Sequence, residues 1–224
     1  MKAIYFSLIF TTLSFCQTRE VKYNIHFNSS LDILEESLGK NAVEKVKHYT
    51  TSLIFNDTVM QYFANSNDLS SYDNSMLEAA TYTNGIYYKS NTSSIVFQEE
   101  KTSLHKDTIL SYHFVTNWHY FQDEKVILGY TCKKATCVLK IECGDGKETQ
   151  LYTVTAWYTE KLPFGFGPKG INIPNGFILE LEDNIITYQA ISIETIPEKE
   201  LFFDTHKKIV TMQNLFTKTL KLRE

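Results

Sequence analysis

Apolar and polar residues alternate along most of this chain with the period of two that is typical of β-strands. Residues 21–27 show it first, where Val21, Tyr23 and Ile25 are separated by polar residues. We expect Pro197 to close the sheet region. The same signals predict further strands at residues 52–55, 59–64, 85–89, 94–98, 109–115, 118–121, 125–129, 130–141, 149–158, 177–182 and 185–193.

Helical spacing is confined to the two ends of the chain. The leucines of residues 31–38 follow possible capping serines, and residues 42–46 can add a short second turn. Thr211 can cap a terminal helix over residues 212–222. Residues 65–84 are rich in Asn, Asp and Ser and predict a long loop. The predicted fold class is mainly β (α+β): a curved antiparallel sheet or half-barrel, with helices near both termini packed on it.

The first sixteen residues have the organisation of a signal peptide. Lys2 precedes an uncharged apolar run over residues 3–15, which is shorter than a membrane-spanning helix. Cleavage after Cys16 and lipidation of Cys16 are both open. The prediction is an exported protein, in the periplasm, attached to the outer membrane or secreted, with residues 17–224 forming one domain and no transmembrane segment after removal of the leader.

Charge and composition restrict the partners. The chain has 22 Lys and Arg against 26 Asp and Glu, a net charge of −4, which disfavours a nucleic-acid partner. Hydrophobic content of 43% with 21% charged residues is ordinary for a globular domain, and 224 residues suffice for a sizeable core. The oligomeric state is left open.

The candidate chemical groups form no recognised constellation. Cys132, Cys137 and Cys143 remain after leader removal, and strand alternation puts the first two on opposite faces, which disfavours a bridge between them. Cys132 is either a thiol activated by the lysines that follow it or, like the others, a buried apolar group. His113 and His119 match no metal-ligand spacing. We therefore predict no catalytic, cofactor-binding or metal-binding residue.

Several short motifs resemble a known family. Residues 127–136 read Ile-Leu-Gly-Tyr-Thr-Cys-Lys-Lys-Ala-Thr, residues 156–159 read Ala-Trp-Tyr-Thr, and residues 172–178 read Asn-Ile-Pro-Asn-Gly-Phe-Ile. Together they resemble the GLPGLI family, secreted proteins of Gram-negative bacteria with no assigned activity. The resemblance implies a structural role for the matching positions. These are Trp118, Gly129, Tyr130, Cys132, Ala135, Trp157, Tyr158, Pro163, Gly167, Pro168, Pro174, Gly176 and Glu180.

The turn region departs from the hexapeptide that names that family. Asn172 stands in place of the first glycine and Asn175 is inserted. Pro174 still fixes φ and Gly176 still permits a left-handed conformation, so a turn remains the expectation.

The aromatic content suggests a function. The chain has 15 Phe, 14 Tyr and 2 Trp, and a curved sheet with helices across its mouth can enclose an apolar cavity. The leading hypothesis is non-catalytic binding of an apolar ligand or an envelope protein; the plainer alternative is that these rings fill the core. An interaction module that uses exposed loops or edge strands comes second, and an uncharacterised enzyme third. Glu180 and Glu182 share a strand face and are interpreted as solvated.

Overall fold

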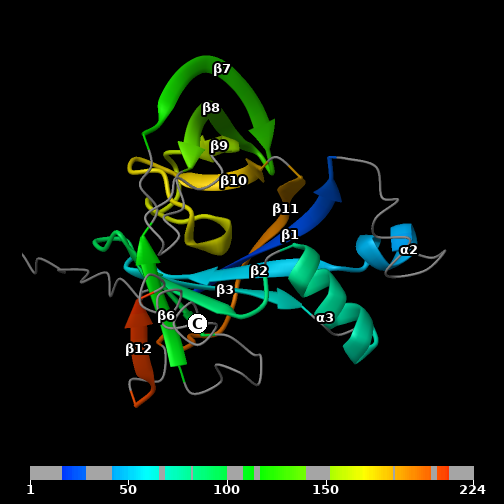
Figure 1. The fold of residues 1–224 in the computed structure, drawn as a ribbon. Helices are drawn as coiled ribbons and strands as arrows, with labels where there is room; N and C mark the ends of the chain where they lie inside the picture. The colour runs from blue at the N-terminus through cyan, green and yellow to red at the C-terminus, as the bar shows by residue number, and fades with distance from the viewer. Residues whose placement is uncertain are drawn as a thin grey trace, which may run out of the picture.

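A computed structural model describes most of the chain (Figure 1). The predicted leader and the predicted helices at residues 31–38 and 212–222 lie outside the described residues. So do Cys16 and Cys143. The described residues are 17–28, 42–65, 69–81, 83–99, 108–113, 117–139, 152–183, 185–202 and 206–211.

One twelve-stranded sheet dominates the fold, as the alternating pattern predicts. Its strands follow the order β12-β6-β5-β4-β3-β2-β1-β11-β10-β9-β8-β7, with β12 and β7 at the two edges. The strands are β1 (Arg19–Phe27), β2 (Thr50–Phe55), β3 (Val59–Asn65), β4 (Ile86–Ser90), β5 (Ile95–Glu99), β6 (Thr108–His113), β7 (His119–Ile127), β8 (Tyr130–Leu139), β9 (Tyr152–Thr159), β10 (Phe177–Glu182), β11 (Ile186–Thr195) and β12 (Lys208–Thr211).

The sheet is mixed, because β12 pairs with β6 in parallel while the other pairs are antiparallel. The prediction that the sheet ends at Pro197 is therefore wrong: residues 196–202 lead onward to a last strand at the far edge. Two predicted strands, at residues 118–121 and 125–129, form one strand, β7, whose register shifts between Tyr120 and Glu124.

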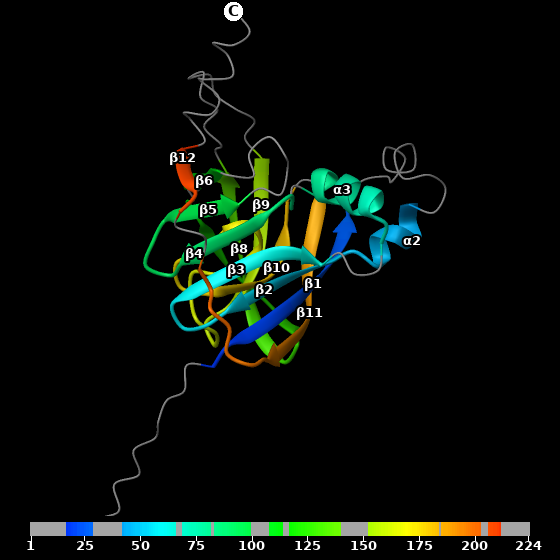
Figure 2. The same cartoon turned by 90° about the horizontal axis from the view of Figure 1, so that it is seen from below.

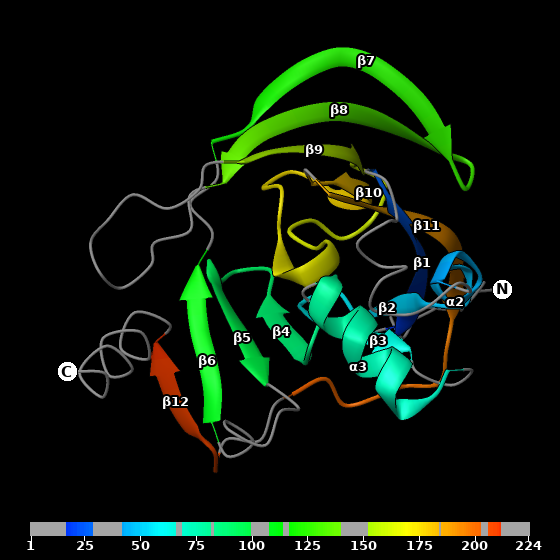
Figure 3. The same cartoon turned by 45° about the vertical axis from the view of Figure 1, so that its right-hand side comes forward.

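The sheet curves around a segment of its own chain (Figure 3). Residues 160–176, here called the plug, leave β9, pass along the concave side and return to β10. The plug contains the short 3-10 helix η1 (Pro168–Gly170). Its apolar side chains join the core, where Phe166 and Phe177 pack against Phe55 with ring centroids 6.2 and 4.7 Å away. The aromatic rings of the concave side therefore pack on one another, as the plainer alternative predicts.

Two α-helices are present among the described residues, and both lie at the same end of the sheet (Figure 2). The short helix α2 (Ala42–Lys47) confirms the predicted turn there. The helix α3 (Ser71–Ala80) shows that the prediction of a loop over residues 65–84 is wrong. Ser70 caps it by accepting from the Asp73 N–H, and Leu77 enters the core.

Neither of these helices is long and apolar enough to span a membrane, within the residues that the structure describes.

Candidate functional site

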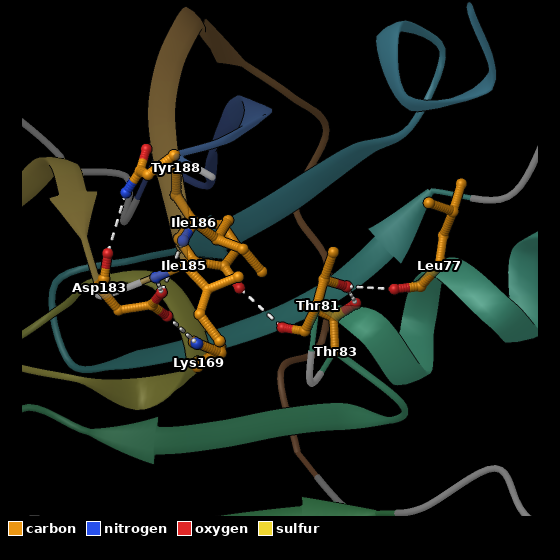
Figure 4. Close-up of polar contacts among 9 residues, drawn as sticks. Leu77, Thr81, Thr83, Lys169, Asp183, Ile185, Ile186 and Tyr188 are labelled. Carbon is orange, nitrogen blue, oxygen red and sulfur yellow. Dashed lines mark hydrogen bonds and ion pairs between the residues drawn. The ribbon is translucent and has the colours of Figure 1, made fainter. Parts of the chain in front are cut away.

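The plug is held by a buried ion pair (Figure 4). Lys169 adopts a positive φ of 57° inside η1, which turns its side chain toward the β10–β11 connection. Its Nζ lies 2.9 Å from Asp183 Oδ2, with about a tenth of each side chain exposed (10% and 11%). The same ammonium lies 4.8 Å from the centroid of the Tyr188 ring. A pair this well buried contributes to stability only while both partners are present.

Hydrogen bonds made by Asp183 and Tyr188 connect this ion pair to the β10–β11 turn and to α3. The other oxygen of Asp183 accepts the backbone N–H groups of Ile185 and Ile186, at 3.1 and 2.8 Å, and so closes the β10–β11 turn. The Tyr188 hydroxyl donates to the backbone oxygen of Thr81, at the C-terminal end of α3. Plug, turn and helix are thus joined through hydrogen bonds that leave little capacity for a ligand.

Three positions of the plug are glycine because neighbouring atoms lie too close to leave room for a side chain. A Cβ at Gly176 would lie 2.3 Å from a Tyr158 ring carbon, and one at Gly167 would lie 2.6 Å from the Ile171 oxygen. Gly170 combines a φ of +77° with a position 2.7 Å from Val96. The expected turn is present, with the Gly176 N–H donating to the Ile173 oxygen at 3.3 Å. The φ of Gly176 is not positive, however, so the left-handed conformation is not used, and the ring of Tyr158 is what requires glycine there.

A different set of side chains lies on the outer face of the sheet, over β7 to β11 (upper strands in Figure 1). Strand register places Lys134, Trp157, Glu180 and Gln189 opposite one another on four successive strands. Trp157 takes the face opposite to that of its buried neighbours in sequence, Ala156 and Tyr158, and is itself partly buried. We call the following set the outer belt: Phe121, Lys125, Lys134, Trp157, Glu180 and Gln189.

Rings and charges alternate along the outer belt. Lys125 Nζ lies 2.6 Å from Glu180 Oε1 and 4.4 Å from the centroid of the Trp157 ring. The other Glu180 oxygen lies 3.4 Å from Gln189 Nε2. Lys134 Nζ lies 5.6 Å from the Phe121 ring centroid and 6.0 Å from that of Trp157. The set thus presents aromatic surface together with cationic, anionic and amide groups.

The predicted motif positions divide between the plug and the strands. Trp118 donates its indole N–H to the Asn172 oxygen of the plug, at 3.0 Å. Gly129 has a φ of +82° in the β7–β8 turn. Pro168 begins η1, whereas Pro174 is exposed. The strands carry Tyr130, Cys132, Ala135, Trp157, Tyr158 and Glu180, and the plug carries Pro163, Gly167, Pro168, Pro174 and Gly176.

The two described cysteines are free and buried. Burial raises the pKa of Cys132 to about 11 and that of Cys137 to about 12. Nearby Lys125 lowers the pKa of Cys132, but by less than burial raises it. The interpretation of these two as apolar thiols is confirmed, and an activated Cys132 is not supported.

Sequence reasoning missed most of the outer belt. Glu180 was expected on a solvated face, yet it is 8% exposed and held by Lys125 and Gln189. The partners of Glu180 come from β7 and β11, and a local sequence motif does not predict contacts between residues on separate strands. The one available signal was strand parity, which puts Trp157 on the face opposite the core.

No group of three or more His, Cys, Asp and Glu side chains is placed to hold a metal ion among the described residues. His119 is exposed on β7, and the side chain of His113 lies outside the description.

Comparison with known proteins gives the family context. The family described as "N-glycanase peptide, N-terminal domain" matches residues 43–219. The fold is similar to a crystal structure of PNGF-II in space group C2, with a TM-score of 0.57 and 19% identity over 92% of this chain. A second PNGF-II structure, in space group P21, has a TM-score of 0.53 and 17% identity over 91% of this chain. The chain spans about a third (33%) of the PNGF-II chains. No curated protein matches it.

These matches overturn the resemblance to the GLPGLI family. The matched family is a different one and covers the same motifs, from Trp118 to Glu180. The physical reason is that glycines and prolines in this segment meet local demands, such as the contact of Gly176 with Tyr158. A strand connection packed against the concave side of a sheet needs small residues and turns of this kind in general. Short motifs of glycine and proline therefore do not identify a family.

Proposed function

Because this chain belongs to the family of N-glycanase N-terminal domains, we propose that it binds asparagine-linked saccharide chains on its outer belt without acting on them chemically. The observation that carries the proposal is the half-buried indole of Trp157 beside Lys125, Lys134 and Glu180. The class of ligand is inferred from the family, and the location of the site is inferred from the side chains of the outer belt.

The chemistry of the outer belt suits a saccharide. A sugar ring has apolar C–H faces that pack on an aromatic plane, and Trp157 and Phe121 offer such planes; Phe121 is 42% exposed. Sugar hydroxyls both donate and accept hydrogen bonds, so the Glu180 carboxylate and the Gln189 amide are suitable partners. A site with apolar planes and a few fixed polar groups is the usual composition of a small-ligand site.

The concave side of the sheet is the less favourable place for a ligand. The plug occupies it, and Phe166, Phe177 and Ile173 are fully buried there. Displacing the plug would break the ion pair between Lys169 and Asp183. We therefore place the proposed ligand outside, and propose a saccharide in place of the apolar molecule first expected.

Export also remains part of the proposal. The charged residue and apolar run at the start of the chain suggest passage through the secretory route, where glycoproteins are encountered.

Calorimetric titration with a free, neutral asparagine-linked oligosaccharide tests the proposal. Trp157→Ala is expected to weaken binding by about tenfold or more, since stacked aromatic residues dominate many binding sites. Tyr72→Ala is the matched control, because Tyr72 is an aromatic residue 64% exposed on α3, away from the outer belt. Equal affinity of Trp157→Ala and the unsubstituted protein, with unchanged melting temperature, would overturn the proposal.

A second candidate function uses the edge strand β7. Tyr120 and Val126 are 50% and 70% exposed there, and among the described strands β7 pairs only with β8. An unpaired edge of this kind accepts an extended peptide as a further strand. In that case an intact glycopeptide would bind more tightly than its released saccharide, and Val126→Lys would remove the difference. No difference between the two ligands would exclude this function.

A further inference from the structure

Lys134 differs from Lys125 and Lys169 in having no carboxylate partner among the residues that the structure describes. Lys125 pairs with Glu180 at 2.6 Å and Lys169 pairs with Asp183 at 2.9 Å. Lys134 has two aromatic rings near its ammonium and no acidic partner within the part of the chain that the structure describes. Aromatic rings hold a cation without neutralising it, so this charge stays available to an anion.

The surroundings of Lys134 add further hydrogen-bonding groups. Two residues along β8, Thr136 lies opposite Thr155 on β9 and His119 on β7. These three side chains share the face of Lys134 because strand residues two apart point the same way. None of the three is buried. An anionic group beside Trp157 would therefore meet one ammonium, two hydroxyl groups and one imidazole.

Two of the neighbouring acids are paired with other lysines, and a third lies on the far side of Thr155 from Lys134. Glu180 is bound by Lys125 and Gln189. Glu160 pairs with Lys133, which points to the opposite face from Lys134. Glu182 lies opposite Thr155, one strand beyond β9, and is exposed. No carboxylate of the described residues lies within ion-pair distance of Lys134, although Glu182 borders Thr155.

We propose that the outer belt selects saccharides that carry a carboxylate, with Lys134 as the residue that recognises the acidic group. This rests on the proposed saccharide-binding function and makes it more specific. The sugar ring lies against Trp157, and its carboxylate contacts the Lys134 ammonium, a compact and strongly hydrated point charge that suits a compact anion. A sulfated sugar would offer a bulkier anion to the same charge, and we assign the site to the carboxylate.

Paired titrations test the assignment. A neutral asparagine-linked oligosaccharide, the same chain ending in a carboxylate-bearing sugar, and a sulfated analogue are compared at low salt. We expect the carboxylated chain to bind about threefold to fivefold more tightly than the neutral one, the magnitude of an exposed ion pair. The preference should shrink as salt is raised, because exposed charges are screened.

Variants separate this inference from the function beneath it. Lys134→Gln is expected to abolish the preference, so that neutral and carboxylated chains bind this variant with equal affinity, and Lys134→Arg is expected to retain the preference. Lys199→Gln is the matched control, because Lys199 also lies over a ring, that of Phe63, at 5.4 Å, but away from the outer belt. Trp157→Ala should weaken binding of all three ligands, which tests the proposed function alone.

A preference that survives Lys134→Gln would overturn the inference, as would equal affinity for neutral and carboxylated chains in the unsubstituted protein. A preference for the sulfated chain equal to that for the carboxylated one would overturn the assignment to a carboxylate. In any of these cases, loss of binding in Trp157→Ala would leave the proposed function standing.

Discussion

The plug and the outer belt each place a lysine between a carboxylate and an aromatic ring, in different surroundings. In the plug, Lys169 pairs with Asp183 over the ring of Tyr188. In the outer belt, Lys125 pairs with Glu180 over the ring of Trp157. The lysine side chain is 10% exposed in the first and 34% exposed in the second, whereas each acid is 11% exposed.

This difference in exposure separates structure from recognition. The inner set is enclosed, and its groups are used to fix the plug, the β10–β11 turn and α3. The outer set keeps part of its indole exposed and lies beside Lys134, a cation with no acidic partner among the described residues. The same combination of ammonium, carboxylate and aromatic ring therefore stabilises the fold on one side of the sheet and can bind a ligand on the other.

The largest expected effect comes from crowding the plug. Gly170→Ala would place a Cβ 2.7 Å from Val96 at a φ of +77° and should lower the free energy of unfolding by about 4 kcal/mol. Gly129→Ala is the matched control, with a φ of +82° and nothing within 4 Å, and should cost about 1 kcal/mol. Urea denaturation measures both. Equal losses would mean that the plug is not packed as described.

Breaking the two ion pairs tests the comparison itself. Lys169→Met leaves a buried Asp183 without its cation and should cost about 3 kcal/mol. Lys125→Met leaves an equally buried acid, but its cation is 34% exposed, so water can reach Glu180 from the vacated side and the cost should be about 1 kcal/mol. Thermal and urea unfolding of the two variants give the values. A loss for Lys125→Met as large as that for Lys169→Met would contradict the division into a structural and a recognition side.

A third lysine sharpens the contrast through pH. Lys89 is 3% exposed on the concave side, opposite Val96, and burial lowers its pKa from 10.5 to about 8. Between these two values the unfolded chain binds more protons than the folded one, so stability rises with pH across that window. Below pH 8 the lysine is charged in both states, and the full penalty of about 3 kcal/mol applies.

The measurement is the difference in unfolding free energy between Lys89→Met and the unsubstituted protein, taken at several pH values. Taking the difference cancels the contributions of other groups, including the buried tyrosines. We expect Lys89→Met to be the more stable at pH 7 and its advantage to decrease from pH 8 to pH 10. An advantage that does not change with pH would show that Lys89 titrates normally.

The smallest expected effect is the absence of thiol labelling. With pKa values raised to about 11 and 12 by burial, Cys132 and Cys137 carry very little thiolate at pH 8. Alkylation should be negligible at both in the native protein and complete in denaturant, and peptide mass spectrometry resolves them. Rapid native labelling of Cys132 would reopen a reactive role on the outer face.

Local patterns predicted most of the fold and little of the candidate site. Period-two alternation located β1 and β11, because one face of each strand is the more buried, whereas β10 is buried on both faces over Phe177–Leu181. The helix α3 was missed since its residues are mainly polar, although Ser70 and Asp73 form a recognisable capping pattern ahead of Leu77.

The remaining features depend on register between distant strands. Lys125 and Glu180 are 55 residues apart, and Lys169 and Asp183 meet only because the plug folds inward. The parallel pairing of β12 with β6 likewise joins the last strand to one that precedes it by many residues. Single-sequence periodicity reports which face a side chain takes, and it does not report which strand lies next to it.

The two tryptophans permit the most direct measurement. Trp157 lies in the outer belt, whereas the Trp118 indole N–H donates to the Asn172 oxygen of the plug. A ¹⁵N NMR titration with a carboxylate-bearing asparagine-linked oligosaccharide would follow both indole N–H signals in one sample. We predict a saturable shift of the Trp157 signal with the Trp118 signal unchanged. A shift confined to Trp118, or no shift at either, would contradict the assignment of recognition to the outer face.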